Sequence, residues 1–344
     1  MKITTIGLDL AKNVLQVHGV DERGAVVVRK QLRREQVIGF FATLEPCLVG
    51  MEACGSSHHW ARRLAQMGHT VRLMPPQYVK PYVKTNKNDA ADAEAICEAV
   101  SRPNMRFVPI KTIEQQTVLS VHRARQAFVA ARTAQGNQIR GLLAEFGLVI
   151  PQGIGNVRRR VPALLQACEA LPGAMRELVQ RLLEHLKGLD AQVKQLEEQI
   201  LAWHNASELS RRLEKIPGIG PLGASALVAS VADARSFRNG RQLAAWLGLV
   251  PRQSSSGGKP RMVGMSKRGD SYLRTLLIHG ARSAIVAAAR KPPGANVWLS
   301  ALLTRRHTNV AAVALANKNA RTIWALLAHD REFRPDYLPR AASA

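Results

Sequence analysis

The sequence predicts an α/β domain built on a mixed sheet, followed by a longer and mostly helical region. Between residues 3 and 100, short runs rich in β-forming residues alternate with amphipathic runs of helical periodicity. After residue 112, two long stretches dominated by Ala, Leu, Gln, Glu and Arg predict long helices. The chain has 344 residues, which is enough for two or three domains that each bury a hydrophobic core.

The predicted sheet begins with three strands, at residues 3–8, 14–20 and 25–29. Because the links between them are short and turn-like, these strands form an antiparallel meander. A helix at 35–44, a strand at 47–51, a helix at 57–67 and a strand at 70–74 follow. Strands that alternate with helices pair in parallel through crossovers, so two parallel strands extend the meander. With a last helix at 88–100, this order is that of the ribonuclease-H-like nuclease fold.

The middle of the chain predicts a helical hairpin or a coiled coil. Long helical stretches are expected at 112–148 and at 162–203, with a break at 151–156. Apolar residues recur in the second stretch at steps of three or four, at Leu182, Leu186, Leu189, Val193, Leu196 and Ile200. The three arginines at 158–160, just after the break, are more typical of a solvated helix face than of a site.

The charge of the chain predicts a polyanionic partner. There are 49 Lys and Arg against 25 Asp and Glu, a formal net charge of +24, and from residue 211 onward the ratio is 22 to 6. No apolar run approaches the roughly 18 residues of a membrane span, and no signal peptide is evident, so a cytoplasmic protein is expected. The four cysteines form no C-x-x-C pair and suggest neither a zinc cluster nor disulfides.

Four carboxylates stand out from their surroundings. Asp9 ends the first predicted strand and Glu52 ends the fourth, where an unpaired buried carboxylate is costly. Those two strands are neighbours in the predicted sheet, so both carboxylates emerge at one edge. Asp89 and Asp92 lie three residues apart and share a helix face. Together the four predict a magnesium site, and two ions could stabilise both oxygens of an in-line phosphoryl transfer. Alternatively, each acid is a helix-terminal or turn-capping residue.

A short glycine turn predicts a contact with DNA phosphates. It lies between two apolar helical stretches and resembles the helix-hairpin-helix motif, in which glycines expose backbone N–H groups at a helix start. Its residues are Pro217, Gly218, Ile219 and Gly220. The alternative is a plain tight turn between two packed helices.

A segment rich in serine, glycine and basic residues follows, predicted as a loop at 252–270. Its cations, and one that follows it, are candidate phosphate contacts: Arg252, Lys259, Arg261, Lys267, Arg268 and Arg274. A serine in such a cradle becomes a nucleophile if a base or a metal assists its deprotonation. By composition alone, the segment is more typical of a mobile basic loop than of a catalytic one.

These segments together resemble the DEDD transposases of the insertion-sequence one-ten family, in particular its one-eleven-eleven branch. Residues 7–12, 50–54 and 87–92 look like the RuvC-like catalytic segments of that family, and residues 213–282 look like its transposase-specific domain. The resemblance implies that Asp9, Glu52, Asp89 and Asp92 form the metal-binding tetrad. It also implies that a serine forms a transient phosphoserine link to DNA, and Ser256 matches best, although Ser254 and Ser255 adjoin it.

The resemblance further implies the partners of the protein. Donor and target DNA would be chosen by a structured non-coding RNA from the element, in the cytoplasm of a bacterium and in association with its nucleoid. Dimers would pair into tetramers, so that the tetrad of one subunit faces the serine loop of another. The expected division is a RuvC-like catalytic domain at 1–110, a helical assembly region at 111–210, a DNA-binding transposase domain at 211–330 and a loose tail at 331–344.

Two other functions remain open from the residues alone. A magnesium-dependent, structure-selective endonuclease of the Holliday-junction type would use the tetrad and water, with Ser256 only gripping a phosphate. A non-enzymatic DNA-binding architectural protein would need none of the four acids, and clustered acids in a basic protein argue against it.

Overall fold

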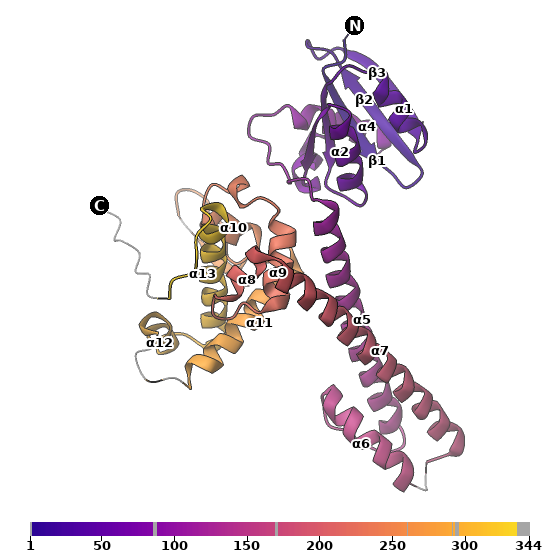
Figure 1. The fold of residues 1–344 in the computed structure, drawn as a ribbon, viewed down its shortest axis with the longest axis vertical. Helices are drawn as coiled ribbons and strands as arrows, with labels where there is room; N and C mark the ends of the chain where they lie inside the picture. The colour runs from indigo at the N-terminus through magenta and orange to yellow at the C-terminus, as the bar shows by residue number, and fades with distance from the viewer. Residues whose placement is uncertain are drawn as a thin grey trace. The chain divides into compact units, whose positions relative to one another are not determined.

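The computed structural model describes residues 2–84, 88–168, 171–259, 261–290, 292 and 296–335. The chain divides into two compact units, residues 1–112 and 113–344 (Figure 1). The first unit holds the sheet, and the second holds the long helices together with the basic region. The four-part domain division expected from the sequence stays a prediction. Within the described residues, no helix is long and apolar enough to cross a membrane.

The first unit is built on a five-stranded mixed sheet, which confirms the predicted α/β class. Its strands are β1 (Thr5–Leu10), β2 (Val14–Val20), β3 (Val26–Arg33), β4 (Leu48–Glu52) and β5 (Thr70–Met74). The spatial order is β3-β2-β1-β4-β5, with β1, β2 and β3 antiparallel and with β4 parallel to both β1 and β5. Strand β3 runs four residues beyond the predicted end, because Leu32 continues the alternation and is buried between exposed neighbours.

Helices cover both faces of this sheet. They are α1 (Gln36–Ala42), α2 (Ser57–Gln66), α3 (Pro76–Val79), the 3₁₀ turn η1 (Lys80–Tyr82) and α4 (Asp89–Val100). On one face Leu8 and Met51 share a core with Trp60 of α2. On the other face α4 lies so close that a Cβ on Gly7 would be 2.1 Å from the Ala93 carbonyl oxygen. A Cβ on Gly50 would be 2.7 Å from Cβ of Val100, so both glycines are needed to seat α4.

The second unit begins with three helices, α5 (Ile113–Ala144), α6 (Ile154–Ala167) and α7 (Gly173–Ala206). Helices α5 and α7 are antiparallel partners, since Arg125 pairs with Glu197 and Arg132 pairs with Asp190. Of the predicted apolar seam, four members are buried, namely Leu186, Leu189, Val193 and Ile200. The helix predicted at 162–203 is in fact two helices, because Pro172 is the N-cap of α7 and the chain turns back before it.

The remaining elements form a mostly helical layer around one core. They are α8 (Glu208–Glu214), α9 (Pro221–Val231), the 3₁₀ turn η2 (Ala234–Ser236), α10 (Gly240–Trp246), β6 (Pro251–Gln253), β7 (Met262–Met265), α11 (Ser271–Ala288), α12 (Val297–Leu303) and α13 (Thr308–Ala328). Leu227, Leu277 and Ile323 lie at the centre of this core. The prediction of a loop without regular structure at 252–270 is wrong, since β6 and β7 pair as an antiparallel hairpin. Most of the tail expected to be loose, at 331–344, lies outside the described residues.

Candidate functional site

The first two candidate carboxylates leave the sheet side by side. The parallel ladder of β1 and β4 ends with Leu8 opposite Met51, so Asp9 and Glu52 are the next residues on adjoining strands. Each lies two residues after a glycine that faces α4. Because side chains two apart on a strand share a face, both carboxylates emerge on the α4 side of the sheet. Both side chains are half-buried there.

The neighbouring thiol shows that the two carboxylates act on one place. The pKa of Cys54 is raised, first by partial burial of the thiol and then by the negative charges of Glu52 and Asp9. A charge acts this way only on a group close to it, because water screens charges that lie farther apart. Both carboxylates are therefore near the Cys54 thiol, just after β4.

The other two carboxylates belong to the first turn of α4. The Asn88 side chain caps this helix by accepting a hydrogen bond from the backbone N–H of Ala91 at 2.8 Å, so α4 begins at Asp89. Cys97 lies over Thr5, with its sulfur 3.8 Å from that carbonyl oxygen, and Ala93 lies over Gly7. The helix thus runs against the direction of β1, and its first turn is directed toward Asp9.

The four carboxylates do not form a closed cage. Among the described residues, no group of three or more His, Cys, Asp or Glu side chains is close enough to hold a metal ion. The structure brings Asp9 and Glu52 together and directs the helix turn that carries Asp89 and Asp92 to the same side of the sheet. Their metal-binding role stays a prediction.

The candidate nucleophile lies at the tip of the β6–β7 hairpin. Ser256 pairs with Lys259 across Gly257 and Gly258, whose φ angles are +55° and +73°. Two consecutive residues with positive φ form a type I′ turn, which suits the twist of a two-residue hairpin and favours glycine. The tip is fully exposed. This Gly-Gly pair between two short extended runs is the sequence signal that could have predicted the hairpin.

The three adjacent serines differ in what their hydroxyl groups do. Ser255 Oγ accepts hydrogen bonds from the backbone N–H of Arg261 and from Gln253 Nε2, both at 3.0 Å, so it joins the two strands. The backbone N–H of Ser254 donates to the Arg261 carbonyl at 2.9 Å. Within the described part of the chain, the Ser256 hydroxyl has no hydrogen-bond partner. The Ser254 hydroxyl likewise has none there, so Ser255 is structural, and of the two available serines only Ser256 lies at the turn.

The base of the hairpin is held by close backbone contacts. A Cβ on Gly248 would lie 2.0 Å from the Arg268 carbonyl oxygen, and one on Gly269 would lie 1.9 Å from the Trp246 carbonyl oxygen. Arg274 Nη1 donates to the carbonyl oxygens of Leu247 and Arg268 at 3.2 and 3.1 Å. Arg274, predicted as a phosphate contact, therefore has a structural role as well. The other candidate cations here are exposed: Arg252, Lys259, Arg261, Lys267 and Arg268.

The glycine turn between α8 and α9 is partly used for packing. Gly218 has φ of +89°, and a Cβ there would lie 2.6 Å from the carbonyl oxygen of Gly280 in α11. Ile219 is buried, whereas Pro217 and Gly220 are exposed and Gly220 precedes the first turn of α9. The alternative of a tight helix–helix turn accounts for Gly218, and only the Gly220 end is open to a phosphate. The helix-hairpin-helix role stays a prediction.

A buried polar cluster connects α5 to α9 and α11, and no feature of the sequence had indicated it. His122 Nδ1 lies 2.8 Å from the Tyr272 hydroxyl, and Nε2 lies 3.1 Å from Ser225 Oγ. Burial, followed by the charge of Arg125, lowers the pKa of His122 to about 4, so its ring is neutral. These partners lie more than a hundred residues away in sequence, and no local pattern joins them.

Comparison with known proteins assigns both units. A family model for the transposases of the IS116/IS110/IS902 family matches residues 210–295, and a model for DEDD transposases of IS110 matches residues 6–147. A probable family 20 transposase of Pseudomonas aeruginosa is 56% identical, covering 97% of this chain and 100% of the relative. The transposase for insertion sequence element IS1111A of Coxiella burnetii is 46% identical, covering 96% of this chain and 92% of the relative.

A third relative, the transposase for insertion sequence element IS1328 of Yersinia enterocolitica, is 42% identical and covers 94% of this chain and 96% of its own. The DEDD family model spans all four candidate carboxylates, and membership in it suggests dependence on a divalent metal. The second model spans the serine hairpin and the glycine turn. The chain therefore belongs to the IS110 family of DEDD transposases, enzymes of DNA recombination.

Proposed function

We propose that this transposase is RNA-guided and that it cuts and rejoins DNA through a transient phosphoserine link at Ser256. The observation that carries the serine assignment is that Ser256 combines an unbonded hydroxyl group with a position at the exposed turn of the hairpin. Ser255 Oγ is bonded within the hairpin, whereas Ser256 Oγ has no partner among the described residues and lies on the exposed turn. A nucleophile has to reach a phosphorus atom outside the protein, and Ser256 satisfies that requirement.

The reaction conserves phosphodiester bonds. The Ser256 oxygen forms a bond to a DNA phosphorus while the bond from that phosphorus to a deoxyribose oxygen breaks. The serine hydroxyl loses its proton to a general base in the active site, and the departing sugar oxygen takes up a proton. In the second step, a sugar hydroxyl of another strand attacks the same phosphorus, and the Ser256 oxygen leaves and is reprotonated. No water enters, so the strands are exchanged and no nick remains.

The second part of the proposal is a magnesium site formed by Asp9, Glu52, Asp89 and Asp92. The donor chemistry fits, because carboxylate oxygens are the ligands that Mg²⁺ prefers. Two such ions would supply positive charge at the attacking and departing oxygens of the phosphoryl transfer. The carboxylates of this chain would hold the ions, and the shared side of Asp9, Glu52 and the first turn of α4 supports their assignment.

The partners complete the proposal. The family resemblance supports a non-coding RNA of the element as the guide to donor and target DNA. It also supports dimers that pair into tetramers, in which the carboxylates of one subunit act with the serine hairpin of another. The net charge of +24 supports the binding of nucleic acids. Location in the bacterial cytoplasm, with the nucleoid, is part of the same proposal.

The experiment is a trap for the covalent link. The protein is incubated with Mg²⁺, the flanking non-coding RNA and end-labelled donor and target DNA, and is then denatured in detergent. Label that stays on the protein reports the phosphoserine, and mass spectrometry locates it. We expect the label to disappear in Ser256→Ala and in Asp9→Asn. Ser255→Ala and Ser254→Ala are the matched controls, and both should retain it.

Other outcomes would contradict the proposal at separate points. Cleaved DNA without label on the protein at any time would favour a water nucleophile, as in a structure-selective endonuclease. Label retained in Ser256→Ala and lost in Ser254→Ala or Ser255→Ala would move the nucleophile along the hairpin. A link that forms equally well without the RNA would remove the guide from the proposal.

A further inference from the structure

Helix α6 carries a charge that its neighbours do not balance. Its sequence contains three arginines, at 158–160, and no acidic residue, whereas α7 contains four Lys or Arg and five Asp or Glu. On α7, cations pair with acids one turn away, as Lys194 does with Glu198 at 3.9 Å and Arg181 does with Glu177 at 3.8 Å. Helix α6 has no acid of its own for such pairs, so its arginines can pair only with residues of other elements.

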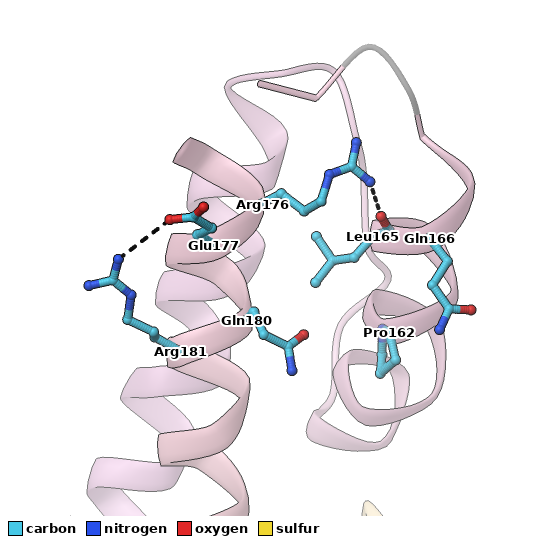
Figure 2. Close-up of a pocket in the computed structure, with 7 residues that line it drawn as sticks. All are labelled: Pro162, Leu165, Gln166, Arg176, Glu177, Gln180 and Arg181. Atoms are coloured by element: carbon cyan, nitrogen blue, oxygen red, sulfur yellow. Dashed lines mark hydrogen bonds and ion pairs between the residues drawn. The ribbon is translucent and has the colours of Figure 1, made fainter. Parts of the chain in front are cut away.

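The groove between α6 and α7 already uses its own cations. Figure 2 shows Arg181 directed to Glu177 and Arg176 directed to the carbonyl oxygen of Leu165 near the end of α6. Arg176 also donates to the Cys168 carbonyl at 2.8 Å, so its guanidinium closes the last turn of α6. The groove cations are thus engaged within the protein, in contrast to two of the three arginines at 158–160.

The cations at the start of α6 divide into one paired and two unpaired arginines. Arg158 forms an ion pair with Asp190 of α7. Arg159 donates only to the neutral side chain of Asn156, at 3.0 Å. Arg160 has no ion pair or hydrogen bond of its side chain among the described residues. All three side chains are exposed, and Arg159 and Arg160 have no acidic partner among the described residues.

Helix α5 carries a further cation, Arg140, close to the segment that precedes α6. Gly136 packs against α6, where a Cβ on it would be 2.6 Å from Cδ1 of Ile154. One turn further along α5, Arg140 Nε donates to the carbonyl of Ile150, just before α6, at 3.0 Å. Its Nη1 donates to the Asn137 side chain at 3.3 Å, so both partners are neutral. Arg140 is half-buried and bonded to these neutral groups, whereas Arg159 and Arg160 are exposed without a carboxylate partner among the described residues, and we name this pair the α6 basic surface.

We propose that the α6 basic surface binds the sugar–phosphate backbone of double-stranded DNA without reading its sequence. Guanidinium groups bind phosphate oxygens through paired N–H donors, and contacts to phosphates position a duplex without discriminating bases. DNA is the substrate of this enzyme family, and it is a polyanion that complements the two exposed, unpaired arginines of this surface. This contact lies on the helical pair of the second unit and is separate in sequence from the hairpin at 251–265. It would hold a flanking stretch of duplex.

The test is the salt dependence of DNA binding by the full chain. Fluorescence anisotropy of a labelled duplex of arbitrary sequence is followed from about 50 to 200 mM salt. The variant is Arg159→Gln with Arg160→Gln, and the matched control is Arg181→Gln with Lys194→Gln, which removes the same charge from α7. Each lost phosphate contact lowers the salt slope by about 0.9. Over this range the wild type should therefore lose about tenfold more affinity than the α6 variant, while the control follows the wild type.

Two further results decide the proposal. Arg159→Lys with Arg160→Lys should restore the wild-type slope, because the salt dependence counts charges and not the geometry of the donor group. The proposal is overturned if the α6 variant has the slope of the control. It is also overturned if that variant keeps its slope and instead changes the molar mass in light scattering, since the surface then joins copies of the chain. The readout requires neither Ser256 nor the carboxylates, so it is independent of the covalent link.

Discussion

Two regions of the molecule hold their candidate functional groups in different ways. In the first unit the carboxylates lie beside a tightly packed helix, and in the second unit Ser256 lies at the exposed end of a hairpin. At the edge, Asp9 and Glu52 follow glycines that lie directly under α4, Gly7 against its backbone and Gly50 against the Val100 side chain. At the hairpin, close contacts hold only the base, at Gly248 and Gly269, and the tip that carries Ser256 is exposed. The glycines under α4 cannot be changed without disturbing the fold. A group at the end of an anchored hairpin can.

The largest effect is expected from Gly7→Ala. Its Cβ would lie 2.1 Å from the Ala93 carbonyl oxygen and 2.4 Å from the Cys97 nitrogen, so α4 has to move off β1. Backbone atoms cannot rotate away as a side chain can, and overpacking of this kind costs about 3 kcal/mol or more. We expect the free energy of unfolding of the first unit to fall by that amount in urea titrations, and DNA strand transfer to be lost with it.

Gly39→Ala is the control for that change. Gly39 lies inside α1 with no atom within 4 Å of its Cβ position, so alanine there should be neutral or stabilise by about 0.5 kcal/mol. If Gly7→Ala unfolds at the same urea concentration as Gly39→Ala, α4 does not rest on β1 as described.

Acid should destabilise the second unit through His122. Burial, and then the charge of Arg125, lowers its pKa from 6.5 to about 4. As the pH falls from 6.5 toward 4, the unfolded chain binds the proton and the folded chain does not. Stability is therefore present above pH 6.5 and decreases below it, by on the order of 3 kcal/mol in total.

The measurement for His122 is urea unfolding at several pH values, followed by hydrogen exchange in α5, α9 and α11. His122→Gln should lose the part of the acid sensitivity that belongs to this ring, so the curves of variant and wild type converge as the pH falls. Parallel curves would contradict the buried neutral imidazole. His18 of the first unit has a pKa lowered in the same direction, mainly by burial, and remains in both proteins.

A smaller effect is expected at the base of the hairpin. Arg274→Gln removes the donor that bonds the Leu247 and Arg268 carbonyl oxygens. Loss of such hydrogen bonds to a charged group costs about 2 kcal/mol. Arg252→Gln removes the same charge from an exposed position and should leave stability unchanged. Thermal unfolding of the two variants separates the anchoring role from the charge, and equal midpoints would refute the anchor.

The smallest effect on stability is expected at the tip. Gly258 has φ of +73° and open space around its Cβ position, so Gly258→Ala costs only the strain of the left-handed region, about 1 kcal/mol. Because the strain is local, the turn should deform and leave the rest of the unit folded. We expect an almost unchanged melting temperature together with a slower formation of the DNA-linked protein. A large loss of stability would show that the tip is packed against the unit.

Much of the fold could be predicted from local patterns. The alternation at Ile6 and Leu8, the short turns between the first strands and the helices that follow lead directly to the mixed sheet. The apolar steps at Leu186, Leu189 and Val193 predicted the buried side of α7. Boundaries were less well predicted, as in the separation of α6 from α7, because a helix end depends on how the chain turns to pack and not only on its composition.

The candidate site could be predicted in part. Asp9 and Glu52 were placed at one edge by strand order alone, since parallel neighbours end on the same side of a sheet. The serine segment was predicted as a loop, because the hairpin depends on pairing between residues 251–253 and 262–265, which composition does not reveal. Neither the structural bonds of Ser255 nor those of Arg274 could be predicted, because their partners are set by the way the chain folds back.

By itself, the sequence determined the α/β class, the long helices, the basic character and the candidate residues, because periodicity, turn residues and charge are properties of neighbouring positions. Only the tertiary structure decided which glycines seat α4, which serine hydroxyl is bonded within the hairpin, and which arginines of α6 have no acidic partner among the described residues. These depend on backbones and side chains that meet from distant parts of the chain. Because the interior is close-packed, two backbone segments can come together only where the side chains between them are small or absent, as at glycine.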